Sequence, residues 1–269
     1  MKPVQLVTPS WCTMYESRKP DALGYVDYPA EENETWAILY NRQYKVIQNR
    51  ACNEFIEGIH LLGMPADHIP QCPEMNERLG RITGWGVEPV AKIIPLKKFF
   101  ELLANKRFPA ATFIRKREEL DYLKEPDIFH EIFGHCPLLT NQAYADFAEN
   151  YGKLALQASP PARSFLGRLW WFTIEFGLLR TPAGLRIYGG GILSSYEESI
   201  YALESPLPKR VNFDIQQIMA STYRYDELQK LYYILNSLDD LFQIGQLDLL
   251  SLANAAQNQD EISEERPPC

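Results

Sequence analysis

Apolar residues recur at the spacing of an α-helix along most of the chain. In the first such stretch Trp36, Tyr40 and Ile47 share one face, and the segment Gly63–Pro65 stops the pattern. The same criteria predict helices over residues 31–48, 53–62, 73–80, 95–105, 128–134, 142–157, 162–179, 195–203, 214–221, 226–235 and 237–244. Side chains at Ser195 and Asp214 are predicted to cap the helices that follow them.

Short apolar segments predict strands over residues 87–94, 110–114 and 185–188. Residues 1–27 show no clear period and contain several Pro and Gly, so we expect an irregular arm there. The polar, acidic end at residues 254–269 is expected to fray. No repeat or low-complexity linker divides the chain. The pattern therefore predicts a single domain, mainly α with a few short strands.

Composition narrows the class of protein. The 269 residues are 46% hydrophobic and 23% charged, as in a globular protein with a substantial core. The net charge of -8 argues against a nucleic-acid partner, because phosphate contacts need a basic surface. No apolar stretch reaches the roughly 18 residues of a membrane helix. Five Cys without C-x-x-C spacing and no signal peptide favour a reducing, cytoplasmic location.

The strongest chemical signal is the stretch Asp127–Pro137, which contains two of the four histidines. His130 and His135 are five residues apart, about 140° around an α-helix, whereas zinc proteases use a spacing of four. Both can bind one metal only if the helix ends or unwinds near the second histidine, and Gly134 and Pro137 supply a reason for that. The alternative is a pair of structural histidines without a metal.

Two histidines leave a metal short of ligands, so a carboxylate should join them. Glu175 is the only charge in the apolar stretch Trp170–Leu179, where an unpaired carboxylate is costly to bury. A buried pair with an arginine would explain it equally well. Glu131 is the rival ligand, but as the neighbour of His130 it should point elsewhere, toward a cofactor pocket. Two histidines and one carboxylate form the facial triad typical of non-haem Fe(II) enzymes that activate O₂.

Four motifs together make the chain resemble the pterin-dependent aromatic amino acid hydroxylases. They occupy residues 125–139, 171–177, 188–195 and 231–233, and the resemblance extends from Tyr28 to Phe242. The fold it implies is a mainly helical, basket-like catalytic domain around a non-haem iron. The resemblance implies that the iron ligands are His130, His135 and Glu175.

The resemblance also implies the substrate and cofactor contacts. Arg115 matches the arginine that holds the substrate carboxylate, and Asp127 should orient Arg115 or His130. The remaining substrate contacts would be Leu123, Trp171, Phe176 and Ser194. The tetrahydropterin contacts would be Val90, Ile93, Ile94, Phe99 and Glu131. Without the resemblance, Arg115 would be a solvated arginine, Ser194 a helix cap, and the two aromatic residues ordinary core.

The activity implied is hydroxylation of L-phenylalanine to L-tyrosine with O₂, Fe(II) and tetrahydrobiopterin or another tetrahydropterin. Lys92, Pro109 and Leu123 differ from the Gly, His and Thr of animal members and look like bacterial members. We expect no regulatory domain and no tetramerising coiled coil, but a monomer, or a homodimer through an apolar patch at Leu247, Leu249, Leu250 and Leu252. The alternatives are a tyrosine or tryptophan hydroxylase of the same family, a zinc hydrolase using the histidine pair, and a non-catalytic interaction protein.

Overall fold

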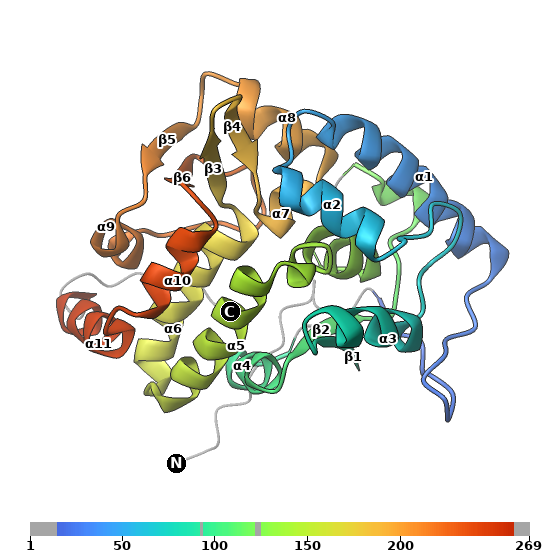
Figure 1. Ribbon diagram of the computed structural model, residues 1–269, viewed down its shortest axis with the longest axis horizontal. Coiled ribbons are helices and arrows are strands. Elements are labelled where there is room, and N and C mark those ends of the chain that lie inside the picture. Colours follow the sequence, from blue (N-terminus) through green and yellow to red (C-terminus); the bar gives the residue numbers. More distant parts are fainter. Residues whose placement is uncertain (1–14, 92–93, 122–124, 261–269) are drawn as a thin grey trace, which may run out of the picture.

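A computed structural model describes residues 15–91, 94–121 and 125–260 of the chain (Figure 1). It is mainly helical with a few short strands, which confirms the predicted fold class. Its α-helices are α1 (Ala30–Ile47), α2 (Asn53–Leu61), α3 (Cys72–Ile82), α4 (Leu96–Ala104), α5 (Gln142–Gln157), α6 (Pro160–Trp170), α7 (Gly190–Leu193), α8 (Tyr196–Glu204), α9 (Ile215–Ala220), α10 (Asp239–Gly245) and α11 (Leu249–Asp260).

Four further helical segments are not α-helices. Two are 3-10 turns, η1 (Arg117–Glu119) and η3 (Leu138–Thr140), and two are π-helices, η2 (Phe129–His135) and η4 (Trp171–Glu175). The predicted caps are confirmed, since Ser195 accepts from the backbone N–H of Glu198 and Asp214 caps α9 in the same way. No helix among the described residues is long and apolar enough to cross a membrane.

The described residues contain six strands, which form two separate sheets. Strands β1 (Gly86–Val90) and β2 (Arg107–Ala111) pair in parallel. The larger sheet has the order β4-β3-β6-β5, built from β3 (Leu178–Thr181), β4 (Gly184–Ile187), β5 (Lys209–Asn212) and β6 (Leu231–Leu235). Figure 1 shows the larger sheet at the upper left and the pair β1-β2 at the lower right of the molecule.

One apolar cluster runs from Val26 to Ala253 and draws side chains from both sheets and from most of the helices. Its fully buried members include Trp36, Phe133 and Tyr188. The two π-helices that carry the predicted iron ligands are part of this cluster, so the candidate site is supported by packing from all sides.

Several predicted elements differ from the structure. The helix predicted over 226–235 is wrong: residues 221–230 are irregular, and Leu231–Leu235 is strand β6 at the centre of the sheet. A parallel strand buried on both faces is a continuous apolar run, which periodicity alone cannot distinguish from a buried helix. The helix predicted over 162–179 ends at Glu175, and β3 begins at Leu178. Strand β5 was not predicted.

The two ends of the chain differ from each other. Residues 15–29 contain no helix or strand, as expected of the irregular arm, and residues 1–14 lie outside the described part. The end expected to fray from residue 254 instead continues as α11 to Asp260, while residues 261–269 lie outside the described part. Leu249 is fully buried, so it cannot belong to the predicted apolar surface patch; Leu247 is 42% exposed.

Candidate metal centre

The two histidines meet because the helix that carries them is wider than an α-helix. Segment η2 is a π-helix from Phe129 to His135, whose i→i+5 bonding places residues five apart over one another. The Nε2 atoms of His130 and His135 are 3.3 Å apart. The expected cause, an end or unwinding of the helix near His135, is therefore corrected to a local widening. Gly134 has a different role: a Cβ there would lie 2.6 Å from the carbonyl oxygen of Gly190.

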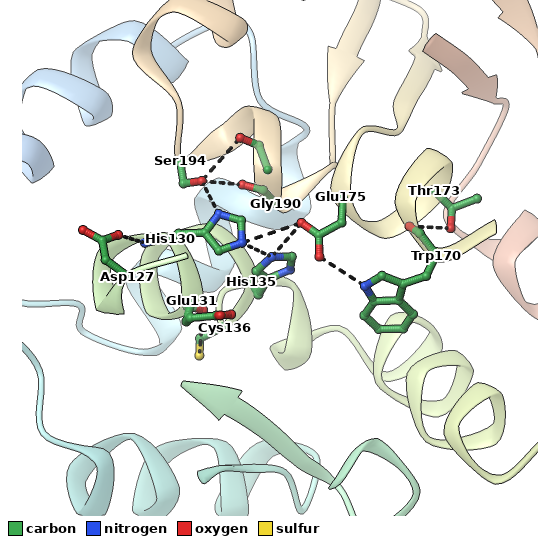
Figure 2. Close-up of polar contacts among 11 residues, drawn as sticks. Asp127, His130, Glu131, His135, Cys136, Trp170, Thr173, Glu175, Gly190 and Ser194 are labelled. Atoms are coloured by element: carbon green, nitrogen blue, oxygen red, sulfur yellow. Dashed lines mark hydrogen bonds and ion pairs between the residues drawn. The ribbon is translucent and has the colours of Figure 1, made fainter. Parts of the chain in front are cut away.

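Glu175 reaches the same point from a second π-helix, η4, in which the N–H of Phe176 donates to the carbonyl of Trp171 at 2.9 Å. Its Oε2 lies 3.1 Å from Nε2 of His135 and 3.7 Å from Nε2 of His130. Its other oxygen, Oε1, accepts a hydrogen bond from the indole N–H of Trp170 at 3.1 Å. Figure 2 shows the three side chains converging on one point.

The hydrogen bonds around His130 decide which of its ring nitrogens carries a proton. The Ser194 hydroxyl donates to the carbonyl of Gly190 at 2.9 Å, so toward Nδ1 of His130, also at 2.9 Å, it acts as acceptor (Figure 2). Nδ1 is then the N–H of a neutral ring, and Nε2 keeps its lone pair. Burial, and next the proximity of His135, hold the pKa of His130 at about 4 despite the nearby carboxylates, which keeps this ring neutral.

These donor atoms fit one metal ion. Two ligand atoms about 2.1 Å from an ion, at 90–110° to each other, lie roughly 3.0–3.4 Å apart, close to the three separations observed here. The donor set, two imidazole Nε2 atoms and a carboxylate oxygen on one side of the point where they meet, leaves open positions for other ligands. Nδ1 of His135 is buried without a hydrogen-bond partner among the described residues.

Two carboxylates border the histidine pair, and their charge distinguishes them. Glu131 also lies close enough to share a metal with the two histidines, but burial and the charge of Glu175 raise its pKa well above the ordinary value. Burial alone would raise the pKa of Glu175 as well, yet the two histidines and the Trp170 N–H hold it at about 2. An anionic Glu175 is the better ligand. The neutral form favoured at Glu131 suits a hydrogen bond to a polar ligand.

His135 is fully buried, and packing on its ring adds to the contacts that its Nε2 makes with His130 and Glu175. Its ring stacks on Phe108 of β2, with centroids 4.7 Å apart. On another side it touches the backbone of Gly190, where a Cβ would lie 2.4 Å from the imidazole Cε1. The glycine run that begins α7 therefore allows the chain to approach the ring closely.

Arg115 and Asp127 form a buried ion pair beside the histidines. The Arg115 guanidinium donates to both oxygens of Asp127, through Nε at 2.8 Å and Nη2 at 2.9 Å, and its backbone N–H donates at 3.0 Å. Asp127 also accepts from the backbone N–H of His130 at 3.0 Å. The carboxylate thus orients Arg115 and the first turn of η2 together, where the sequence left the choice between them open.

Two groups of aromatic residues adjoin Glu175. Phe99 of α4 is half-buried and meets Trp170, whose indole N–H binds Glu175, edge to face with centroids 5.2 Å apart. Trp171, at the start of η4, contacts Phe176 at 4.5 Å and stacks on Tyr223 at 4.2 Å between centroids. Val90 and Ile94 are half-buried, and Ser194 is buried; the predicted contacts Ile93 and Leu123 lie outside the described residues.

Sequence reasoning missed three polar or aromatic residues around the aromatic pair. Gln229 accepts a hydrogen bond from the Trp171 indole N–H, Glu198 accepts from the backbone N–H of Gln229, and Tyr223 stacks on Trp171. The only sequence signal was proximity, since Gln229 lies two positions before the motif at residues 231–233.

Two surface hollows lie elsewhere. One of about 630 Å³ is lined by residues of α2, of β4 and of the turn between α1 and α2, and one of about 600 Å³ by residues of the larger sheet and α10. Neither includes a predicted ligand. We place the candidate site at the histidine pair because convergent donor atoms and shifted pKa values mark chemistry, whereas the size of a hollow alone does not.

Comparison with known proteins gives a consistent result. Residues 11–246 match the family described as biopterin-dependent aromatic amino acid hydroxylase. The phenylalanine-4-hydroxylase of Pseudomonas aeruginosa is 53% identical, over 91% of this chain and 93% of that protein. Apo phenylalanine hydroxylase from Colwellia psychrerythraea has a TM-score of 0.88 at 49% identity, over 91% of this chain and 95% of the other. The Chromobacterium violaceum enzyme with bound oxidised Fe(III) has a TM-score of 0.84 at 44% identity, over 91% and 90%.

Proposed function

This chain belongs to the biopterin-dependent aromatic amino acid hydroxylases, and we propose that it converts L-phenylalanine to L-tyrosine with O₂, Fe(II) and a tetrahydropterin. The observation that carries the proposal is the convergence of His130, His135 and Glu175 within a chain that matches bacterial phenylalanine-4-hydroxylases over most of its length. The zinc hydrolase and the non-catalytic protein lose their support, because residues 11–246 match the hydroxylase family and the three ligand candidates of that family converge here.

The protein's own part in the reaction begins with the metal. His130, His135 and Glu175 hold it from one side, and Ser194 keeps the lone pair of His130 Nε2 directed at it. Bound Fe(II) and tetrahydropterin supply the chemistry that activates O₂. The apolar surroundings, with Phe108 on the ring of His135, keep bulk water away from the reacting groups.

The proposed substrate contacts come from the Arg115–Asp127 ion pair and from an aromatic wall formed by Trp171 and Phe176. Two nitrogens of Arg115 are held by Asp127, which leaves Nη1 to bind the substrate carboxylate. Trp171 and Phe176 enclose the aromatic ring, and Ser194 contributes by holding His130. We also propose Leu123, which lies outside the described residues, as a substrate contact. The gain in rate comes from holding one ring carbon at a fixed place beside the metal.

The tetrahydropterin side is formed by β1, α4 and the turn of η2. Phe99 offers a ring that can stack on the pterin, and Val90, Ile93 and Ile94 supply the apolar and backbone contacts. Glu131, with its raised pKa, is a hydrogen-bonding partner for the pterin edge. Phe99 touches Trp170, whose N–H binds Glu175, so the pterin side and a metal ligand are linked by two contacts.

The test is a turnover assay with purified protein, Fe(II), O₂ and tetrahydrobiopterin, in which tyrosine is measured by chromatography. L-phenylalanine should yield tyrosine, and Zn(II) in place of Fe(II) should yield none. L-tyrosine and L-tryptophan serve as competing substrates, and a higher kcat/KM for either would assign the chain to a different substrate within the family. Absence of tyrosine under reducing, aerobic conditions with loaded iron contradicts the proposal.

We also propose that the enzyme acts in the cytoplasm as a single catalytic domain, either a monomer or a homodimer. The continuous apolar cluster from Val26 to Ala253 supports one domain, and the free buried Cys52, Cys72 and Cys136 suit a reducing compartment. Light scattering of the purified protein at two concentrations distinguishes monomer from dimer.

A further inference from the structure

A buried glutamine connects the aromatic wall to a segment without regular structure. Gln229 is 5% exposed and lies near the end of the irregular stretch at residues 221–230, just before strand β6. Its Oε1 accepts from the indole N–H of Trp171 at 3.1 Å. Its Nε2 donates to the carbonyls of Arg224 at 2.6 Å and Glu227 at 3.1 Å. One side chain thus holds both the wall and the segment that lies against it.

The orientation of this amide follows from its partners. An indole N–H can only donate and a backbone carbonyl can only accept, so the oxygen of Gln229 must face Trp171 and the nitrogen must face the two carbonyls. Both N–H groups of the amide and its oxygen are used. An apolar side chain of the same length could make none of these bonds and would leave buried polar groups without partners.

The segment held by Gln229 also supplies a ring to the wall. Tyr223 stacks on Trp171 with 4.2 Å between centroids and 16° between planes, and it meets Phe172 edge to face at 6.1 Å. Trp171 contacts Phe176 as well, at 4.5 Å. The angle of the Trp171 indole is therefore determined by two aromatic contacts and one hydrogen bond.

The glutamine is itself anchored to the rest of the fold. Its backbone N–H donates to Oε1 of Glu198 at 3.0 Å, and the Tyr232 hydroxyl of β6 donates to the same oxygen. Glu198 is 5% exposed and lies in the first turn of α8, whose cap, Ser195, is the neighbour of Ser194. A continuous set of contacts thus joins Trp171 to the segment that supports His130.

We propose that Gln229 is a positioning residue for the hydroxylation: its amide sets the angle of the Trp171 indole and holds Tyr223 against it, so that the substrate ring has one place beside the metal. This inference rests on the proposed function. Gln229 touches neither the metal ligands nor the predicted pterin contacts by any hydrogen bond described above, so its removal acts on the substrate side. A ring that is less well placed is hydroxylated in fewer of the turnovers that oxidise the pterin.

The test compares wild type with Gln229→Leu, Trp171→Phe and the double variant, with Gln157→Leu as matched control. Gln157 is exposed and bonds only Lys153 among the described residues, at 3.4 Å. Gln229→Leu should lower kcat/KM for L-phenylalanine by roughly 10- to 100-fold, the range for a misplaced reactant. It should also lower the tyrosine formed per tetrahydropterin oxidised. Co(II) affinity should stay at the wild-type value, and the control should match wild type throughout.

The double variant separates positioning from general support. If the amide acts through Trp171, the loss in the double variant should be no larger than that of the worse single variant, rather than the product of the two. Wild-type yield of tyrosine per tetrahydropterin in Gln229→Leu, or multiplying losses in the double variant, would overturn the inference. So would a parallel loss of Co(II) affinity and thermal stability, because that marks a merely structural role.

A readout without turnover keeps the two proposals distinguishable. The near-UV circular dichroism of Trp171, obtained as wild type minus Trp171→Phe, should change in the Gln229→Leu background while the far-UV spectrum is retained. If wild type makes no tyrosine, the proposed function fails, and an unchanged Trp171 signal in Gln229→Leu would independently refute the positioning role.

Discussion

At the scale of single residues, charge distinguishes the two neighbouring carboxylates as candidate metal ligands and favours Glu175. The pKa of Glu175 is held at about 2, whereas that of Glu131 is raised, although both are close to the histidine pair. Glu175→Gln keeps the size and an acceptor for the Trp170 N–H but removes the charge. Its Co(II) and Fe(II) affinity should fall by at least about 100-fold, because loss of a ligand weakens binding more than loss of a residue that only supports a ligand. Tyrosine formation should stop.

Glu131→Gln is the matched control, because it changes the neighbouring carboxylate in the same way. It should retain the wild-type Co(II) affinity by titration calorimetry and lose affinity for the tetrahydropterin instead. An equal loss of metal affinity in both variants would show that Glu131 is a ligand, as its distance from the histidines allows.

The ion pair of Asp127 and Arg115 should make stability depend on acid pH. Burial would raise the pKa of Asp127, but the charge of Arg115 and the hydrogen bonds from Arg115 and His130 hold it below the ordinary value. Its contribution is therefore full above the unfolded pKa of about 4 and is lost as pH falls through the lower folded pKa. Asp127→Asn should lower the free energy of unfolding of the metal-free protein by about 3–5 kcal/mol at pH 7.

Urea unfolding of metal-free protein between pH 7 and pH 3 checks this dependence. The difference between wild type and Asp127→Asn should begin to shrink below pH about 4, where the carboxylate becomes protonated in the unfolded chain but not yet in the folded protein. Curves that stay parallel down to pH 3 would contradict the assigned role of the carboxylate.

At the scale of elements, the π-helix explains what the sequence could and could not predict. The spacing of His130 and His135 showed that an ideal α-helix cannot bring both to one ion, and the resemblance named Glu175. The π-helical form of η2, which brings the two histidines together, could not be predicted from Gly134 and Pro137. It depends on the packing of η2 against α7 and β2. Local propensity favours an ordinary helix end there, and tertiary contacts override it.

The same packing makes Gly190 a sensitive position in α7. A Cβ at Gly190 would overlap the ring of His135, which is fully buried and cannot turn away. Gly190→Ala should therefore destabilise the protein by roughly 1–3 kcal/mol, as overpacking does, and weaken Co(II) binding by displacing the imidazole. Thermal unfolding and Co(II) titration measure the two effects.

Gly80→Ala in α3 is the control, and its expected effect on stability is opposite to that of Gly190→Ala. A Cβ there meets only the carbonyl oxygen of Trp85, at 3.9 Å, and alanine is the better helix former. It should stabilise the protein by up to about 1 kcal/mol without changing Co(II) affinity. Wild-type metal affinity in Gly190→Ala would contradict the close approach of α7 to His135.

At the scale of the whole molecule, the fold class could be predicted from the sequence, whereas the four-stranded sheet could not. The helical periods of α1, α5 and α8 are carried by side chains within each helix and were predicted close to their bounds. Strand β6 pairs with β3 and β5, and the paired residues Leu178–Ile234 and Lys209–Leu231 are 56 and 22 positions apart in the chain. Nothing within Leu231–Leu235 records those partners, so the apolar run alone predicted a helix.

The proposed metal ligands come from parts of the chain that are distant in sequence, so removal of the metal should lower the stability of the whole molecule. His130 and His135 lie on η2, and Glu175 lies on η4. Ser194, at the end of α7, is hydrogen-bonded to His130. A ligand at 100 times its dissociation constant stabilises the native state by about 2.7 kcal/mol, which corresponds to a rise in Tm of roughly 5–10 °C for a chain of this size. Thermal unfolding with Co(II) and with a chelator should show this difference, and Glu175→Gln should show little of it. Equal Tm values with and without metal in the wild type would mean that the three side chains do not bind one ion together.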